Sequence, residues 1–425
     1  MPVRAIIWIV AYVVGAILAF VHPISGLFAY FLDYYAHPPL RWWGKALPDI
    51  RWSLLISVVT LVAFFINRYK LPELNIKNHP QTKWLIPFVL NALIVTSITA
   101  VSPEQSWKNA LELTKLAALY FLIIQTVRTK EHFRYIILIQ IVGVFLWGLD
   151  AFDHPKRSAG RLIGIGGSDS LNDNGAAAQL LTILPFIGVV FLVGKRWEKA
   201  ICMVAAPFVL NAFILCNSRG AFIGLLGTGV GALLLSKGAF RWKTLLAMLI
   251  AGVLFYNLTD RQFIERQQTI ESHEDTAATD RLESWKAALR LIADHPLGTG
   301  GGGFSALSPI YIPQIVEAHG GEQRNVHSTL LQAGSEWGIL GLFFFVAAQL
   351  STLIELHRLR RIPPTTPEEK RMHAESLAIE LGFIGLMTAG IFTSRLYAEA
   401  VYWILALTGV LKNIYAKERE KSTDH

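Results

Sequence analysis

The chain has 425 residues, of which 53% are hydrophobic and only 16% are charged, and its mean hydropathy is +0.42. A soluble chain carries about 25% charged residues, so the composition excludes an ordinary water-soluble enzyme. The net charge of +8 need not imply nucleic acid, because lysine and arginine also gather in the cytoplasmic loops of membrane proteins. Apolar runs of roughly 15 to 22 residues recur throughout and are continuous rather than alternating, so they predict membrane-spanning helices and not the strands of a barrel.

The apolar runs, taken in chain order, predict an all-α polytopic membrane protein with about 12 spanning helices. The first run follows Arg4 but is not succeeded by a small-x-small cleavage site, so we expect a retained helix and not a signal peptide. The segment 24–36 is short and aromatic, and we expect it to be interfacial or re-entrant. The predicted spans are 5–22, 53–67, 84–101, 110–127, 133–150, 175–193, 198–216, 220–236, 241–257, 329–354, 376–393 and 398–412.

Lysine and arginine are concentrated in alternate loops, which the positive-inside rule assigns to the cytoplasm together with the C-terminal tail. This assignment leaves one large periplasmic insertion between spans nine and ten, and a loop of that length is usually functional. We therefore expect three parts: spans one to nine in residues 1–257, a periplasmic loop domain in residues 258–327, and spans ten to twelve with a cytoplasmic tail in residues 328–425.

In this topology, several arginines and a histidine fall on the periplasmic side. Arg161, Arg219, Arg281 and Arg324 lie in loops or near helix ends, and His327 lies where a long apolar helix begins. Like charges do not gather without an anion to bind, and guanidinium groups match phosphate oxygens bidentately. A histidine can take a proton from an attacking hydroxyl near neutral pH. The group therefore predicts a site for a diphosphate or a phosphate-bearing lipid.

Two other features near these residues leave alternatives open. Gly300 and Gly302 belong to "GTGGGG", which permits close backbone approach and could cradle a sugar or phosphate or act as a hinge. It is neither a Walker motif nor a dinucleotide fingerprint. Glu336 lies about 10 Å inside its helix, so its carboxylate is either functional or part of a structural ion pair with one of the arginines.

Other chemistries fit the sequence less well. Ser218 and His327 could form a protease dyad, but no nucleophile elbow surrounds the serine. Asp150, Asp153 and His154 offer oxygen and nitrogen ligands, but their spacing is not diagnostic of a metal site. We therefore expect neither a metal nor a cofactor.

Three ordered segments resemble the O-antigen ligase and polymerase family of bacterial inner-membrane proteins. "NSRGAFIGLL" is similar to the family's Ser-Arg-Gly segment at the start of a helix. "RLESWKAALRLIADHPLGTGGGGF" resembles its Arg…Trp…Ala stretch, which leads into a glycine-rich turn. "VHSTLLQAGSEWGILG" is similar to its His…Glu-x-Gly-x-x-Gly segment. The likeness extends from about Arg161 to Tyr402.

The resemblance implies a GT-C-like glycosyltransferase of lipopolysaccharide biosynthesis in the bacterial inner membrane, with its active site facing the periplasm. The implied donor is a glycan on undecaprenyl diphosphate, and the implied acceptor is a hydroxyl of the lipid A-core oligosaccharide. Transfer would be metal-independent and inverting. Arg219 and Arg281 match the family's essential arginines, and His327 matches its catalytic histidine. The residues expected to contact substrate are Arg161, which lies near a looser basic position, and Arg324, Asn174, Gly300, Gly302 and Glu336.

The acceptor is less well specified than the chemistry. A protein O-oligosaccharyltransferase or an O-antigen or exopolysaccharide polymerase of the same family is an alternative. "TSRLYAEAVYWILAL" and the N-terminal "YYAHPPLRWWGKALPDIRWS" resemble a subgroup of O-glycosylation ligases linked to exopolysaccharide sorting systems. A flippase for lipid-linked oligosaccharides, the alternative from another class, is disfavoured. The unusual charges gather on one face, and few ionisable groups besides Glu336 and Glu380 lie mid-span.

Overall fold

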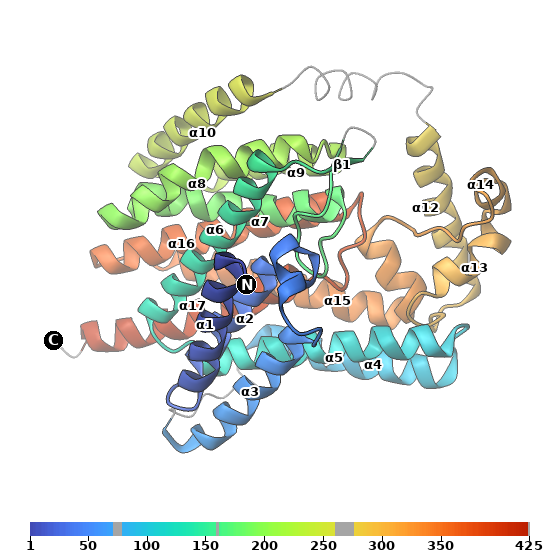
Figure 1. The fold of residues 1–425 in the computed structure, drawn as a ribbon, viewed down its shortest axis with the longest axis horizontal. Helices are drawn as coiled ribbons and strands as arrows, with labels where there is room; N and C mark the ends of the chain where they lie inside the picture. The colour runs from blue at the N-terminus through green and yellow to red at the C-terminus, as the bar shows by residue number, and fades with distance from the viewer. Residues whose placement is uncertain (71–78, 159–160, 260–275, 424–425) are drawn as a thin grey trace.

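The computed structural model describes residues 1–70, 79–158, 161–259 and 276–423, and these are almost entirely helical (Figure 1). The prediction of an all-α protein is therefore confirmed. A hairpin of two short antiparallel strands, β1 and β2, is the sheet structure in the described part of the chain. The elements are α1 Val3–Ala19, α2 Ile24–Ala36, η1 Pro38–Leu40, η2 Trp42–Ala46, α3 Trp52–Ile66, η3 Arg68–Lys70, α4 Pro80–Ile98, α5 Pro103–Thr126, α6 Lys130–Asp153, β1 Arg157–Ser158, β2 Arg161–Leu162, α7 Asp173–Val193, α8 Arg196–Leu215, α9 Arg219–Leu235, α10 Gly238–Leu258, α12 Thr276–Asp294, α13 Gly303–Tyr311, α14 Pro313–Ala318, α15 Thr329–Arg361, α16 Pro367–Gly390 and α17 Glu399–Thr423.

The helices include several that are suited to cross a bilayer. Among the described residues, α4, α6, α7, α8 and α15 are long and apolar enough, and α1, α3 and α9 are shorter apolar helices. A helix also covers each of the other ranges in which the sequence predicts a span. The chain is thus a multi-pass membrane protein, while the number of 12 spans stays a prediction.

The segment 24–36 forms the 13-residue helix α2, which is too short to span and lies inside the bundle. It packs against α1, α3 and α6. The Tyr34 and Tyr35 rings lie against Trp147 and Trp403, and the Trp147 indole N–H donates to the Tyr35 carbonyl at 2.7 Å. These aromatic side chains fill the protein core, and the prediction of an interfacial or re-entrant segment stays a prediction.

Small residues allow α9 to lie close to α7 and α16. A methyl group at Gly224 would lie 2.6 Å from Leu181 on α7 and 2.8 Å from the Gly385 carbonyl on α16. Close approach of helix backbones at small residues is the usual way in which membrane helices associate without a hydrophobic driving force. The start of α9, which carries Arg219, is therefore held in a fixed position between two other helices.

The helix α15 is broken at Gly338, where φ is 73° and ψ is −176°. The loop from Pro296 to Gly300 fills the break. Its Gly300 amide donates to the Glu336 carbonyl at 2.9 Å, and its Pro296 carbonyl accepts from the Ile339 amide at 2.9 Å. Broken helices are tolerated in membranes when other groups satisfy the freed backbone. The break therefore docks the glycine-rich loop against α15.

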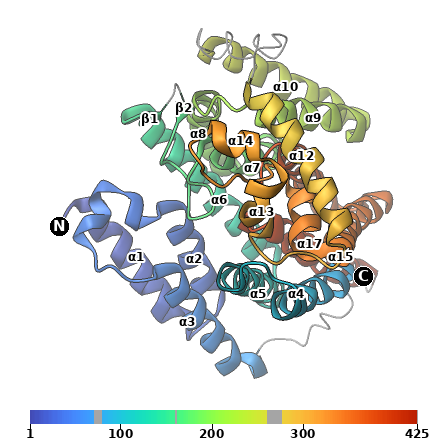
Figure 2. The ribbon, with the colours of Figure 1, turned by 90° about the vertical axis from the view of Figure 1, so that its right-hand side faces the viewer.

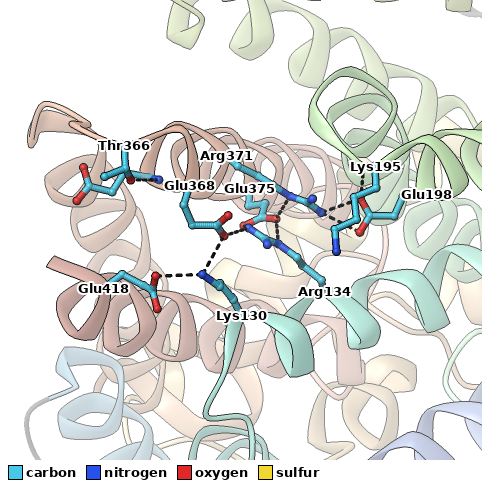
Figure 3. A network of polar contacts seen from close by, with 10 residues as sticks. Lys130, Arg134, Lys195, Glu198, Thr366, Glu368, Arg371, Glu375 and Glu418 are labelled. Atoms are coloured by element: carbon cyan, nitrogen blue, oxygen red, sulfur yellow. Dashed lines mark hydrogen bonds and ion pairs between the residues drawn. The ribbon is translucent and has the colours of Figure 1, made fainter. Parts of the chain in front are cut away.

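A network of ion pairs joins the starts of α6, α8 and α16 at the end of the bundle where α17 terminates (Figure 3). Arg134 of α6 pairs with Glu375 of α16 at 2.7 Å. Arg371 pairs with the same carboxylate at 3.0 Å and with Glu198 of α8 at 2.9 Å. Because each charge is paired, this end of the bundle can bury its arginines. The helices α12, α13 and α14 lie at the opposite end (Figure 1).

Candidate active site

The four arginines that the sequence singles out come from separate segments at the end of the bundle that carries α12 to α14. Arg161 lies on β2, Arg219 is the first residue of α9, Arg281 lies on α12, and Arg324 lies in the loop before α15. Figure 2 looks onto this end, with α12, α13 and α14 in front. Burial lowers the pKa of the Arg281 guanidinium, and the charges of Arg161 and Arg219 lower it further. The fold therefore brings at least three of these cations within electrostatic range of one another.

Asp173 is a carboxylate that the structure places among these cations. It is the first residue of α7, and Arg161 donates to its Oδ2 at 2.7 Å. Its side chain is mostly buried, and its negative charge opposes the lowering of the pKa of Arg281. Asp173 therefore offsets part of the repulsion between the arginines, and the group (Arg161, Arg219, Arg281 and Arg324, with Asp173) keeps an excess of positive charge.

His327 lies beside this arginine group, two residues before α15 begins. Burial lowers the pKa of its imidazole to about 4, and the charges of Arg281 and Arg324 contribute to this shift. The ring is therefore neutral at physiological pH and can accept a proton. Its backbone has a φ of 51°, in the left-handed region that few residues other than glycine adopt. Such strain is typical of functional sites, where the surrounding structure holds the residue in place.

Asn174 joins the start of α7 to the start of α9. Its side-chain oxygen accepts from Ser218 Oγ at 2.7 Å, and Ser218 Oγ in turn caps α9 by accepting from the Ala221 amide. Ser218 thus hydrogen-bonds to an asparagine and serves as a helix cap, which gives it a structural role in place of the nucleophile of a protease dyad. The contact holds Arg219 next to the loop that carries Arg161.

Residues 204–346 match the sequence profile of the O-antigen ligase family. This part of the chain is therefore similar to the O-antigen ligase family. The matched segment includes Arg219, Arg281, Arg324 and His327, whereas Arg161 precedes it. The match supports a glycosyltransferase activity of the O-antigen ligase or polymerase type. No protein among the curated sequences matches the chain.

Close packing against neighbouring residues explains why the positions predicted to contact substrate, Gly300 and Gly302, are glycines. A methyl group on Gly300, where φ is 81°, would lie 2.6 Å from Ser106 Oγ, and one on Gly302 would lie 2.8 Å from the Gln105 side chain. Ser106 Oγ also accepts from the Gly301 amide at 2.9 Å. The glycine run thus packs closely against the start of α5. This packing accounts for the lack of side chains whether or not a ligand binds nearby.

Glu336 lies on α15 with a side chain that is almost fully buried. Its carboxylate accepts from Gln332 at 3.1 Å and from the hydroxyl of Tyr397. The sequence predicted an arginine as its partner, which was wrong, because the fold places a tyrosine from the turn before α17 against it. The other mid-span carboxylate, Glu380, forms an ion pair with Arg360.

The aspartates and histidine that were weighed as a metal site do not converge. Asp150 forms ion pairs with Arg4 at 3.4 Å and with Arg41 at 3.3 Å. Within the described ranges, no group of three or more histidine, cysteine, aspartate or glutamate residues could hold a metal ion. Asp150 thus has an electrostatic role at the end of α6.

Sequence reasoning missed two residues beside the arginine group. Neither Asp173, which lies next to the predicted Asn174, nor Arg395 is among the residues that the sequence predicts for the site. Asp173 is adjacent to Asn174 and twelve residues from Arg161, so a search for acidic residues close to the arginines could have found it. Arg395 is distant in sequence from the other arginines, and its contacts required the structure.

Proposed function

We propose that this chain is an O-antigen ligase of the bacterial inner membrane. It transfers a glycan from undecaprenyl diphosphate to a hydroxyl of the lipid A-core oligosaccharide at the periplasmic face. The observation that carries this proposal is the gathering of arginines from separate segments around one buried, neutral histidine. The match to the O-antigen ligase family supports the reaction class, and the charge of the group favours a donor that leaves as a diphosphate.

In the proposed reaction, an acceptor hydroxyl attacks the anomeric carbon of the donor sugar as the bond to the diphosphate oxygen breaks. The proton of the hydroxyl passes to His327, and the diphosphate leaves with the bonding electron pair. Arg219 and Arg281, with Arg161 and Arg324, stabilise the negative charge that develops on the leaving group. Because one direct displacement takes place, the anomeric configuration inverts.

The low pKa of His327 suits a base that is activated by its own substrate. Before the donor binds, burial and the neighbouring arginines keep the imidazole neutral, but they also make it a weak base. A bound diphosphate adds negative charge beside the arginines, which raises the pKa of the histidine. Since a general base works best when its pKa is near the operating pH, donor binding strengthens His327 for the step that follows.

The guanidinium groups also supply the charge stabilisation that a divalent cation gives in many phosphate sites. We therefore expect transfer by the purified protein to continue in EDTA, as measured by the rate of glycan transfer before and after chelation. Loss of transfer that returns on addition of Mg²⁺ would contradict metal independence.

The acceptor is tested by reconstituting the purified chain in vesicles with a glycan on undecaprenyl diphosphate. One reaction receives lipid A-core, a second receives a serine-rich peptide, and a third receives no added acceptor. The proposal predicts a glycosylated lipid A-core in the first reaction alone. A glycosylated peptide would indicate a protein O-oligosaccharyltransferase, lengthened donor glycan would indicate a polymerase, and either result would overturn the ligase assignment.

A further inference from the structure

We propose that Arg395 is a positioning residue of the transferase site, which holds the loop carrying Arg161 against the start of the helix preceded by His327. This inference rests on the proposed function. Arg395 lies between α16 and α17, outside the family match, and only 4% of its surface is exposed.

The guanidinium group of Arg395 forms hydrogen bonds with the loop between β2 and α7. Its Nη1 donates to the Asp169 carbonyl at 2.7 Å, and its Nη2 donates to Ser170 Oγ at 3.0 Å. The Asp169 carboxylate lies 3.7 Å from the same Nη2 and compensates the buried charge. Arg161 lies at one end of this loop, and its partner Asp173 lies at the other. The contacts of Arg395 therefore fix the loop between those two residues.

The backbone of Arg395 is joined to the start of α15. Its amide donates to Thr329 Oγ1 at 3.0 Å, and Thr329 Oγ1 donates to the Thr393 carbonyl at 2.9 Å. Thr329 is the first residue of α15 and follows His327 by two positions. One residue thus connects the segment of the candidate base to the loop of a candidate phosphate ligand.

A second buried arginine holds the same loop from another side. Arg41 donates to the Ile165 carbonyl at 2.6 Å and to the Gly164 carbonyl at 3.2 Å. On the opposite side, Gly175 approaches Arg395 so closely that a methyl group would lie 2.7 Å from its Nη1. The loop is therefore fixed at both ends by guanidinium groups, and α7 begins in contact with one of them.

The chemistry of Arg395 fits a positioning role and not a ligand role. Its Nη atoms already bond to the loop, and the side chain is almost wholly enclosed. A guanidinium group presents several donors in a rigid plane, whereas a lysine ammonium is a point charge on a flexible stem. Lysine therefore cannot hold Asp169 and Ser170 in the same geometry. Loss of these hydrogen bonds lets Arg161 move relative to His327 but removes no group that touches substrate.

The experiment compares Arg395→Gln and Arg395→Lys with a matched control, Arg371→Gln, which removes a buried, ion-paired arginine at the other end of the bundle. We expect Arg395→Gln to raise the KM for the undecaprenyl-diphosphate glycan by about 10-fold, which is in the range of coupling between residues that share one hydrogen-bond network. Arg395→Lys should recover little of this loss. The control should lower thermal stability by a similar amount and leave the donor KM unchanged.

A double-mutant cycle with Arg161→Gln decides whether Arg395 acts through the loop. If it does, Arg395→Gln has little further effect on the donor KM once Arg161 is gone, since the group to be positioned is absent. If the two substitutions raise the donor KM by factors that multiply in the double variant, the inference is overturned. It is also overturned if Arg395→Gln has the same donor KM as wild type. If Arg395→Gln fails to fold, Ser170→Ala is tested in the same cycle, because it removes the hydrogen bond between Arg395 and Ser170 Oγ.

A binding measurement separates this inference from the proposed function. Binding of undecaprenyl diphosphate is measured by the thermal stabilisation of the full chain. If the wild type binds the lipid but transfers no glycan, the proposed function fails. In that case, weaker binding of the lipid by Arg395→Gln than by Arg371→Gln would still support the inference. Equal binding by both variants would overturn it.

Discussion

At the scale of single residues, the account depends on the protonation of His327. Burial and the charges of Arg281 and Arg324 lower the pKa of its imidazole to about 4. A base must be unprotonated to act, so transfer falls as the pH falls through this pKa. Because bound diphosphate raises the pKa, the fall in kcat should begin at a higher pH than the fall in kcat/KM, which reports the free enzyme. Steady-state rates measured from pH 9 to below the pKa of about 4 cover both falls. Falls in kcat and kcat/KM at the same pH would contradict activation of the base by its substrate.

Asp173 gives a second prediction at this scale. Its carboxylate competes with a diphosphate for Arg161, so Asp173→Asn should tighten binding of undecaprenyl diphosphate by about fivefold, since an ion pair of this kind is worth roughly 1 kcal/mol. The matched control is Asp294→Asn, which alters a carboxylate that bonds to Tyr311 instead of to the arginine group. Binding by both variants is measured on the full chain. Weaker binding by Asp173→Asn would show that the aspartate positions Arg161 and does not compete with the ligand.

The sequence predicts the arginines and the histidine more readily than their partners. Arg219, Arg281 and His327 stand in recognisable motifs, and charge asymmetry places them on one side of the membrane. The partner of Glu336 could not be predicted in this way, because Tyr397 is 61 residues away and a tyrosine carries no charge to indicate a pairing. Arg395 likewise resembles any basic residue at a helix end until its contacts are seen.

At the scale of elements, the break in α15 is the feature that the sequence least reveals. Residues 329–354 form an apolar run that predicts one continuous span, yet the structure interrupts the helix at Gly338. The freed backbone groups find partners in the loop 296–300 and in Asn91, whose side chain donates to the Trp337 carbonyl at 2.8 Å. Those partners lie far away in the sequence, so the local pattern could not indicate the break.

A substitution tests this break. Gly338→Ala should destabilise the protein by several kcal/mol, because its backbone conformation is nearly exclusive to glycine and a methyl group would lie 2.5 Å from the Leu297 carbonyl carbon. Gly188→Ala on α7 is the control, since nothing lies within 4 Å of its added methyl group. It should leave the melting temperature unchanged or slightly raised. Equal melting temperatures for the two variants would contradict the structural account of the break.

At the scale of the whole molecule, the two ends of the helix bundle carry different groups of charged residues. The ion-pair network of Arg134 and Arg371 lies at the end where α17 terminates (Figure 3), and the helices α12 to α14 lie at the other end (Figure 1). Composition and apolar runs sufficed to predict the helices, because a spanning segment must satisfy its own backbone. The burial of α2 was not predicted, because aromatic residues favour a membrane interface and a packed core alike.

The sidedness of the molecule is tested by labelling single cysteines introduced after the buried Cys202 and Cys216 are replaced by alanine. We expect a membrane-impermeant maleimide to label Glu322→Cys in cells with a permeable outer membrane. Lys370→Cys, which is also exposed, should react only after the inner membrane is opened. The reverse pattern would place the arginine group in the cytoplasm and contradict a periplasmic site.

The central claim is that His327 and the arginine group form the site of glycan transfer. Its most direct test is His327→Ala in reconstituted vesicles, with His295→Ala as a control at an exposed histidine of the same segment between α10 and α15. We expect His327→Ala to lose transfer to lipid A-core yet bind undecaprenyl diphosphate as wild type does, while His295→Ala keeps both activities. Transfer by His327→Ala at the wild-type rate would contradict the account.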